Sequence, residues 1–186
     1  MSEPLLVFAL EAETQGLFDK YDHLYTGCGK VQATYELTRR LAETRPSLIV
    51  NLGTAGSARI TPGTVVQCRQ FVQRDMEASA LGVAPEVTPF SDIPATLTYG
   101  LAVEGLPEAV CGTGDSFVTH RQDMSYDIVD MEAYALALVA MREDVPFACL
   151  KYISDNSDEN AADDWSHALR RAATALAQAL PEVLTR

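Results

Sequence analysis

The sequence predicts an α/β fold, because short apolar runs alternate with amphipathic stretches along its 186 residues. Leu5 to Leu10 is apolar, Val31 to Thr44 is amphipathic, and Leu48 to Leu52 is apolar again. With 47% apolar and 22% charged residues, the composition is that of a globular chain. A chain of this length can bury a sufficient core without a disulfide or a metal. We therefore expect a single α/β domain over residues 1–186.

The predicted helices depend on apolar residues that recur at helical spacing. In the first helix the apolar stripe consists of Val31, Thr34, Tyr35, Thr38, Leu41 and Ala42, with Arg39, Arg40 and Glu43 turned outward. A second helix is expected from Glu132 to about Arg142, since Pro146 prevents its continuation. A third runs to the C-terminal end, with Asp163 or Asp164 as its cap and an apolar face that begins at Trp165.

Four further strands are predicted where apolar runs are bounded by Gly, Pro, Asp or Asn. They are Thr64 to Val72, Ala109 to Gly112, Asp127 to Val129 and Phe147 to Ser154. Between Gly82 and Gly105 the pattern weakens, because Pro85, Pro89 and Pro94 break any long element. We expect irregular structure or a lid-like loop in this region.

The chain is acidic, with 14 basic and 26 acidic residues and a net charge of −12. Such a surface does not attract a nucleic-acid backbone or an anionic membrane. The first apolar run is flanked by Glu3 and Glu11 and has no basic leader, which argues against a signal peptide and a membrane span. We expect neither nucleic acid nor a membrane as a partner.

The cysteines do not form a recognisable metal or redox motif. Cys28, Cys68, Cys111 and Cys149 are widely separated and form neither a C-x-x-C pair nor a Cys/His cluster. Unpaired thiols are typical of the reducing cytoplasm, where we expect this protein. The sequence implies no metal and no cofactor.

Several common catalytic motifs are also missing. The G-C-G-K segment at 27–30 is neither a phosphate-binding P-loop nor a complete dinucleotide fingerprint. There is no G-x-S-x-G or H-E-x-x-H motif, and the histidines are scattered, which excludes the usual serine-hydrolase and zinc-protease patterns. The acidic stretch from Asp155 to Asp164 lacks the glycine and the final glutamate of a calcium loop.

Polar residues instead follow the predicted strands, where open α/β sheets hold their ligands. These segments are Glu11 and Glu13, G-T-A-G at 53–56, G-T-G-D-S-F-V at 112–118, D-M-E at 130–132, and Ser154 with Asp155. One such residue alone can be a helix cap or part of the core. Five strand ends with polar residues together indicate a binding site.

At the level of motifs, the chain resembles the 5′-methylthioadenosine/S-adenosylhomocysteine nucleosidases, within the purine nucleoside phosphorylase and nucleosidase superfamily. The matching segments, in order along the chain, are F-A-L-E-A-E at 8–13, G-C-G-K-V-Q-A at 27–33, N-L-G-T-A-G at 51–56, P-G-T-V-V at 62–66, R-D-M-E-A-S-A-L-G at 74–82, G-D-S-F-V at 114–118, V-D-M-E-A at 129–133 and I-S-D at 153–155. The resemblance implies a three-layer α/β/α sandwich with a central mixed sheet, and a homodimer. It also implies a small-molecule purine nucleoside as substrate.

The family's reaction is hydrolysis of the bond between a purine and a ribose, which requires help at both ends of that bond. Protonation at N7 relieves the charge on the leaving purine, and an activated water captures the cationic sugar. The resemblance assigns the general acid to Asp155 and the water-activating base to Glu13. For Asp155 to donate a proton near neutral pH its pKa must be raised, which burial against Tyr152 and Trp165 would do.

The resemblance also implies contacts to ribose and purine. Glu132 corresponds to the carboxylate that holds the ribose hydroxyls, and Met131 to the methionine beneath the sugar. Phe117 matches the aromatic that stacks on the purine, and Val118 the residue whose backbone reads the purine edge. Ser154 is expected to steady the acid.

Further contacts are expected around the turn and the C5′ position of the ribose. Thr54, Ala55 and Gly56 form a tight turn beside sugar and base, where a missing side chain lets backbone approach the ligand. Leu10 and Trp165 match the apolar pocket for the C5′ substituent. Any of these residues could instead belong to the ordinary core.

Hydrolysis is favoured over phosphorolysis, because phosphate binding needs arginine. Phosphorylases of the superfamily carry one arginine after the first strand and another before the G-S/T-x-G turn. Here these places hold Glu11 to Glu13 and Asn51 with Leu52. A carboxylate at Glu13 would repel phosphate and suits water activation.

Two departures from the family pattern leave the substrate open. Asp130, which we include among the substrate-binding residues, stands where the nucleosidases have glutamate. The region from Gly82 to Ala109 is shorter than in typical members and contributes there to the dimer and the C5′ pocket. The alternatives are a futalosine-type hydrolase, a purine nucleoside phosphorylase, or a purine-nucleoside binding module without activity.

Overall fold

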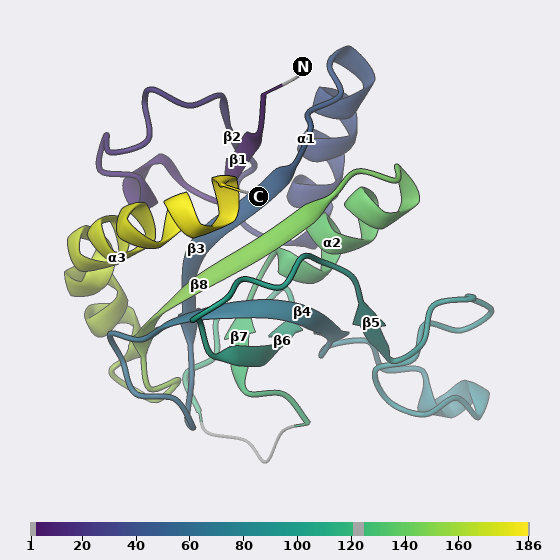
Figure 1. The fold of residues 1–186 in the computed structure, drawn as a ribbon. Helices are drawn as coiled ribbons and strands as arrows, with labels where there is room; N and C mark the ends of the chain where they lie inside the picture. The colour runs from purple at the N-terminus through teal and green to yellow at the C-terminus, as the bar shows by residue number, and fades with distance from the viewer. Residues whose placement is uncertain (1–2, 121–124, 186) are drawn as a thin grey trace.

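Eight strands and three α-helices follow one another in residues 3–120 and 125–185, which are the residues that the computed structural model describes (Figure 1). The strands are β1 (Leu5–Phe8), β2 (His23–Tyr25), β3 (Ile49–Gly56), β4 (Val65–Gln73), β5 (Thr96–Thr98), β6 (Glu108–Thr113), β7 (Ile128–Asp130) and β8 (Phe147–Asp155). The helices are α1 (Lys30–Glu43), α2 (Ala133–Arg142) and α3 (Ala161–Leu184), with short 3₁₀ helices at Glu11–Glu13 and Ser79–Leu81.

The strands form one mixed sheet in the order β2-β1-β3-β7-β6-β4-β5. Strand β8 pairs with two members of this path, parallel to β3 and antiparallel to β4. Five strands, β3, β7, β6, β4 and β8, therefore close into a ring. The expected α/β fold with a mixed sheet is confirmed, whereas the three-layer sandwich stays a prediction because the sheet closes on itself.

Both faces of the parallel part of the sheet are buried, as the continuous apolar runs require. Leu5 and Val7 of β1 belong to a core shared with α1 and α2, while Leu6 and Phe8 belong to a second core shared with α3. Figure 1 shows α1 and α2 together and α3 apart from them. Because β1, β3 and β8 run parallel, their C-terminal ends lie at one edge.

The first helix forms where the sequence predicts it, but it buries a different face. Ala33 and Leu37 are buried, with Leu41 packed against the same core. Val31 and Tyr35 of the predicted stripe are 76% and 61% exposed. The prediction of the buried face was wrong because this helix carries two apolar sets at helical spacing, and the set with Ala33 and Leu37 is the one that enters the core.

Other boundaries also differ from the predictions. The first strand ends at Phe8, since the chain turns into the 3₁₀ helix that carries Glu13. Helix α3 begins at Ala161 after Asn160, so Asp163 and Asp164 are not its cap but lie in its first turn, where they favour the helix dipole. Strands β2 and β5 were missed because neither is a buried apolar run, whereas the equally short β7 is buried throughout.

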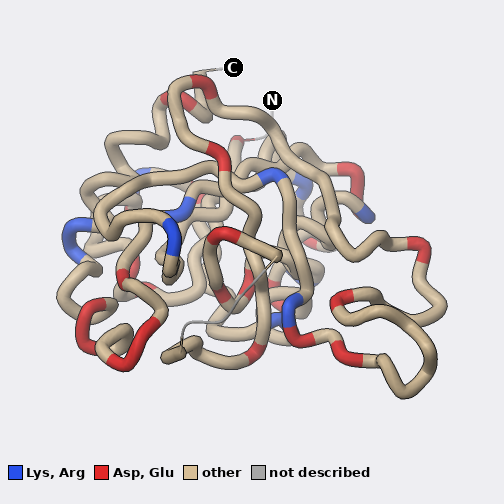
Figure 2. Tube along the Cα trace, turned by 90° about the horizontal axis from the view of Figure 1, so that it is seen from below, with Lys and Arg blue, Asp and Glu red and all other residues tan. Residues whose placement is uncertain are grey.

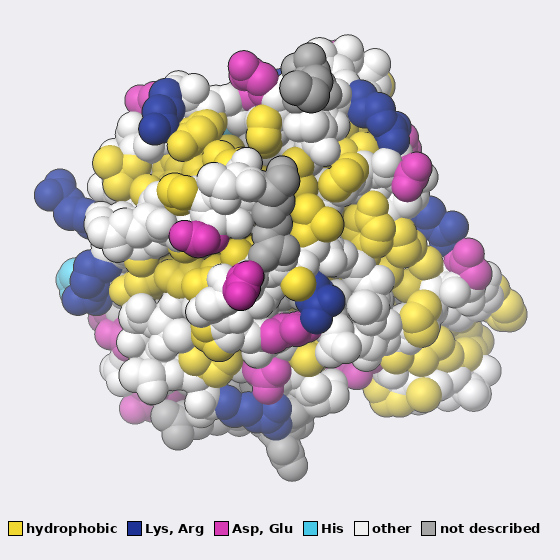
Figure 3. Space-filling view, in the orientation of Figure 1, with side chains coloured by type: hydrophobic (Ala, Val, Ile, Leu, Met, Phe, Trp, Pro, Cys, Tyr) yellow, Lys and Arg dark blue, Asp and Glu magenta, His cyan; other side chains and the backbone are white. Residues whose placement is uncertain are grey.

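The region from Gly82 to Gly105 contains β5 and is otherwise irregular. In Figure 1 the segment between β4 and β5 projects from the body, and Figure 3 shows hydrophobic side chains on the surface there. Leu81 and Phe90 are exposed.

Figure 2 shows basic positions scattered among acidic ones along the trace. No helix in the described parts of the chain is long and apolar enough to cross a membrane.

Candidate active site

A cavity of about 190 Å³ lies where the C-terminal ends of the parallel strands meet the loops after β6 and β7. Every residue to which the family resemblance gave a role in the site, together with Asp130, lies on its wall: Leu10, Glu13, Thr54, Ala55, Gly56, Phe117, Val118, Asp130, Met131, Glu132, Ser154, Asp155 and Trp165. Of the polar segments after the strands, Glu11, Gly53 and residues 112–115 do not line it. Further lining residues, to which no role was assigned, are Ala9, Cys28, Arg74, Ser116 and Val129. No described residue of the region 82–105 lines the cavity, so the expected lid does not cover it here.

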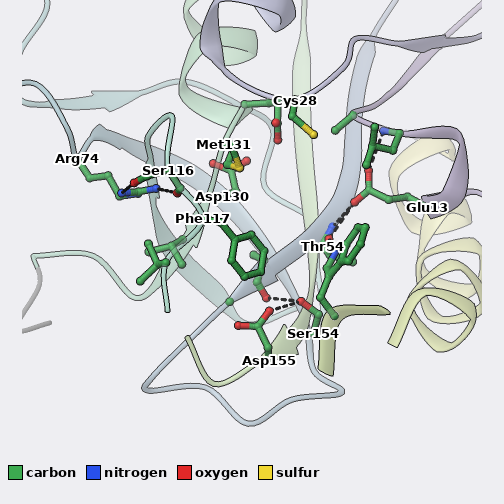
Figure 4. Close-up of a pocket in the computed structure, with 18 residues that line it drawn as sticks. Glu13, Cys28, Thr54, Arg74, Ser116, Phe117, Asp130, Met131, Ser154 and Asp155 are labelled. Carbon is green, nitrogen blue, oxygen red and sulfur yellow. Dashed lines mark hydrogen bonds between the residues drawn. The ribbon is translucent and has the colours of Figure 1, made fainter. Parts of the chain in front are cut away.

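Glu13 is fixed by three hydrogen bonds in which its carboxylate is the acceptor. Oε1 accepts from the backbone N–H and from the hydroxyl of Thr54, each at 2.9 Å, and Oε2 accepts from the backbone N–H of Leu10 at 3.2 Å. The side chain is 4% exposed. All three partners are donors, so the Glu13 side chain is held by accepted hydrogen bonds alone. Figure 4 shows Glu13 directed at Thr54, away from Asp155.

Asp155, at the end of β8, is buried beside Gly56, the last residue of β3. Oδ2 accepts from the hydroxyl of Ser154 at 2.7 Å, and Oδ1 accepts from the backbone N–H of Ser157 at 2.9 Å. Burial raises the pKa of Asp155 above its ordinary value, although these two hydrogen bonds act in the other direction. The expected direction of the pKa shift is confirmed. Tyr152, however, packs with α3 and does not line the cavity.

The approach of Asp155 depends on a glycine at position 56. A Cβ built there would lie 2.6 Å from Oδ1 of Asp155 and 2.4 Å from the hydroxyl of Ser157. No real Cβ tolerates contacts this short, so any larger residue would move the acid. The expected tight turn at Thr54, Ala55 and Gly56 was wrong, because these residues form the end of β3 and pair with β8. The absence of a side chain at Gly56 still permits the close approach of Asp155.

Glu132 lies on another wall, immediately before α2. Its Oε1 accepts at 2.8 Å from the N–H of Gly29, whose φ of 93° is a left-handed conformation suited to glycine. Burial and the neighbouring Asp130 raise the pKa of Glu132 to about 8, although Lys151 opposes them. This shift favours the protonated form of Glu132 at neutral pH.

Asp130 turns its carboxylate away from the cavity and into the protein. It pairs with Lys151 at 2.8 Å and accepts from Thr113 at 2.5 Å and from the N–H of Ala133 at 2.8 Å. Burial opposes both charges, but the ion pair lowers the pKa of Asp130 and raises that of Lys151. Through these partners, Asp130 connects β7 to β8, to β6 and to the start of α2.

The side of the cavity around Phe117 contains a cation. Phe117 is 47% exposed and lies beside Val118 and Ser116. The guanidinium of Arg74 donates at 3.1 Å to the hydroxyl of Ser116 and at 3.1 Å to the carbonyl of Gly114 (Figure 4). Its buried Nε has no hydrogen-bond partner among the described residues.

The remaining wall is largely apolar. It contains Leu10, Met131 and the indole of Trp165, whose Nε1 donates at 2.9 Å to the hydroxyl of Thr54. The thiol of Cys28 also faces the cavity, and burial with the nearby Glu132 and Glu13 raises its pKa. In the described residues, no three His, Cys, Asp or Glu side chains are grouped to hold a metal.

The lining residues that the sequence analysis passed over had a usable signal. Cys28, Arg74 and Ser116 each fall inside a segment that carries the family resemblance. Arg74 precedes an aspartate in its segment and was read as part of the pattern. Its contact with the loop after β6 joins residues 42 positions apart, which no local pattern reveals.

Comparisons with known proteins agree with this geometry. A sequence model described as "Phosphorylase superfamily" matches residues 23–185. A 5′-methylthioadenosine/S-adenosylhomocysteine nucleosidase of Haemophilus ducreyi is 31% identical, over 73% of this chain and 67% of its own length. An aminodeoxyfutalosine nucleosidase of Helicobacter pylori is 28% identical, over 86% of this chain and 78% of its own.

Solved structures share the fold. The 5′-methylthioadenosine/S-adenosylhomocysteine nucleosidase of Helicobacter pylori with butyl-thio-DADMe-Immucillin-A gives a TM-score of 0.90 at 20% identity, covering 100% of this chain and 98% of that one. The native futalosine hydrolase of the same species gives 0.89 at 20% identity, covering 99% and 97%. Since the family model spans most of the chain, the chain belongs to the phosphorylase superfamily.

Proposed function

We propose that the protein is a purine nucleosidase that hydrolyses the N-glycosidic bond of 5′-substituted adenosines, such as methylthioadenosine or S-adenosylhomocysteine. One observation carries this proposal: two buried carboxyl groups with different surroundings line the same cavity. Glu13 is surrounded by hydrogen-bond donors, whereas burial raises the pKa of Asp155. Pairs of titratable groups whose environments differ in this way supply an acid and a base.

In the proposed reaction Asp155 donates its proton to N7 of the purine as the glycosidic bond lengthens. The hydroxyl of Ser154, 2.7 Å away, keeps the carboxyl in place. Proton donation prevents full negative charge on the departing base, so the bond breaks more readily. The products are the free base and an electron-poor sugar.

Glu13 then accepts a proton from the water that attacks C1′ of the sugar. Its Oε1 is already bonded to Thr54 twice, so the carboxylate cannot turn away from the cavity. A fixed base needs little reorganisation during the reaction. The proton from water ends on Glu13 and the hydroxyl group on C1′, which completes the hydrolysis.

The other walls match the remaining parts of a nucleoside. We assign the ribose hydroxyls to Glu132 and the sugar's apolar face to Met131. The purine is expected to stack on Phe117 beside Val118. Leu10 and Trp165 would then receive the C5′ substituent. Asp130 supports this wall through Lys151 rather than by touching the substrate.

A second candidate, a purine nucleoside phosphorylase, is favoured by Arg74. Its guanidinium is the one cationic group among the described residues that line the cavity, and guanidinium groups bind phosphate. Three of its contacts are already made to Ser116 and Gly114, however, which leaves less of it available. A futalosine-type substrate and a binding module without activity are further alternatives.

Base release from a panel of nucleosides tests the proposal. The panel contains methylthioadenosine, S-adenosylhomocysteine, adenosine, inosine and a futalosine analogue, each with and without phosphate. Release that does not depend on phosphate supports the hydrolase and ranks the substituents at C5′. Release that requires phosphate would make the protein a phosphorylase, and a thermal shift with adenine but no release would make it a binding module.

We also propose that the protein is a homodimer in the cytoplasm. The exposed stripe of α1 borders a groove of about 690 Å³ together with Tyr134 and Leu138 of α2. An apolar helix face of this kind is typical of an interface. Light scattering on the wild type and on Tyr35→Glu tests the dimer, since a charge at this position should yield monomers.

The four free cysteines agree with a reducing compartment such as the cytoplasm.

A further inference from the structure

We propose that Trp165 is a positioning residue for the base, acting through the hydroxyl of Thr54 on Glu13. This inference rests on the proposed function, because it assigns a task to a residue of the same site. A wall of the C5′ pocket needs only the apolar face of an aromatic ring. The N–H of the indole has a separate and specific use in this chain.

The three groups form a chain of hydrogen bonds with a fixed direction. Nε1 of Trp165 lies 2.9 Å from Oγ1 of Thr54, which in turn lies 2.9 Å from Oε1 of Glu13. The indole N–H can only donate, and an ionised carboxylate can only accept. The hydroxyl of Thr54 therefore accepts from Trp165 and must direct its single proton to Glu13.

This arrangement limits the rotation of the Thr54 hydroxyl. Without the indole N–H, the hydroxyl proton could turn toward other acceptors, and Glu13 would lose one of its donors for part of the time. A donated hydrogen bond also polarises the hydroxyl and strengthens the bond that it makes next. Trp165 thus acts on Glu13 without touching it.

The hydrogen bonds from Trp165 through Thr54 to Glu13 also connect three parts of the fold that are distant in sequence. Glu13 belongs to the 3₁₀ helix after β1, Thr54 to β3 and Trp165 to α3, and Trp165 is 111 positions from Thr54. Thr54 is held in register opposite Tyr152 of β8. Glu13, the proposed general base, is therefore held in place by both the sheet and α3.

The arrangement predicts that the substituent at C5′ affects the rate constant as well as binding. The ring of Trp165 lines the cavity while its N–H holds Thr54. A substituent that packs on the ring without moving it preserves the hydrogen-bond chain. A substituent that displaces the indole also disturbs Glu13, the proposed general base.

The test removes the N–H and keeps the ring. Because the chain has a single tryptophan, expression with 3-benzothienylalanine, in which sulfur replaces the indole N–H, changes position 165 alone. Trp165→Phe is the genetic counterpart. For the substrate that the wild type hydrolyses, we expect kcat to fall about five- to tenfold, the effect of one hydrogen bond, with KM changed by less than about threefold.

A mutant cycle then separates positioning from packing. Thr54→Val lacks the hydroxyl, so loss of the indole N–H should lower the kcat of this variant no further. The same is expected in Glu13→Gln. Thr54→Ser keeps the hydroxyl, so loss of the indole N–H should lower its kcat as much as it does in the wild type. Multiplicative losses in Thr54→Val, an effect confined to KM, or an unchanged kcat would each overturn the inference. If Glu13→Gln itself left kcat unchanged, the assigned base in the proposed function would fail instead.

Discussion

Lys151 and Asp130 form an ion pair at 2.8 Å in which both side chains are 2% exposed, directly behind the cavity wall. Neither charge can reach water, so each depends on the other for its stability. The pair joins β8, which carries the proposed acid, to β7, which leads into Met131 and Glu132. The geometry of two walls of the cavity therefore depends on one buried interaction.

Removing one partner of this pair should destabilise the protein strongly. We expect Asp130→Asn to lower the free energy of unfolding by about 3–5 kcal/mol, because it leaves a buried ammonium without its counter-charge. Urea denaturation measures the change. Asp92→Asn, which breaks the exposed pair with Arg142, is the matched control and should have little effect. Equal losses in the two variants would contradict this account.

Replacing the proposed acid should remove most of the activity but not the fold. We expect Asp155→Asn to lower kcat by about 10²- to 10⁴-fold, the usual contribution of a positioned proton donor. The amide oxygen can still accept from the N–H of Ser157, while its NH2 group can donate to the hydroxyl of Ser154. Base release and circular dichroism should be measured together. A folded variant with activity within a few-fold of the wild type would refute the assignment.

The raised pKa of Glu132 should make the protein less stable as the pH increases. Between the ordinary value of 4.5 and about 8, the unfolded chain loses this proton while the folded chain keeps it. The free energy of unfolding therefore falls through this window, by up to about 1.4 kcal/mol per pH unit. Glu132→Gln removes the dependence, so its stability relative to the wild type should rise from pH 5 to pH 8. Parallel pH profiles would contradict the prediction.

The close contact at Gly56 can be separated from a general packing defect. Gly56→Ala should displace Asp155 and lower kcat about 10²-fold, since a shift of about 1 Å has this cost. Gly112→Ala is the control, because the atoms nearest to its Cβ would be those of the ring of Tyr126, at 2.5 Å, and Tyr126 does not line the cavity. We expect both variants to lose stability and only Gly56→Ala to lose kcat in the folded fraction. Similar kcat values in both would disprove the steric argument.

The sequence predicts which residues gather around the cavity better than it predicts the sheet. Strand ends carry a local signal, since a polar residue such as Asp155 directly follows an apolar run, and parallel strands bring these ends together. The closure of the sheet has no local signal. It depends on β8 pairing with β4, and these partners, such as Val65 and Tyr152, lie far apart in sequence.

The face of α1 shows why periodicity alone can mislead. Val31 and Tyr35 satisfy a helical stripe, but so do Ala33 and Leu37, and the sequence does not say which stripe meets α2. In the structure Ala33 and Leu37 enter the core that also contains residues of α2, a choice between two stripes that no local pattern decides. The indole N–H of Trp165 was missed for a related reason, because residue type indicates an apolar wall and only the structure reveals its acceptor.

The closing role of β8 also orders events during synthesis. As the ribosome extends the chain, β3 and β4 emerge before β8. The edge of each strand that pairs with residues 147–155 is therefore still without its partner. Ser154 and Asp155 arrive on this same strand, and Trp165 arrives still later. A truncated or unfinished chain therefore has neither a closed ring nor the proposed acid, so the completion of the barrel-like sheet and the assembly of the active site are one event.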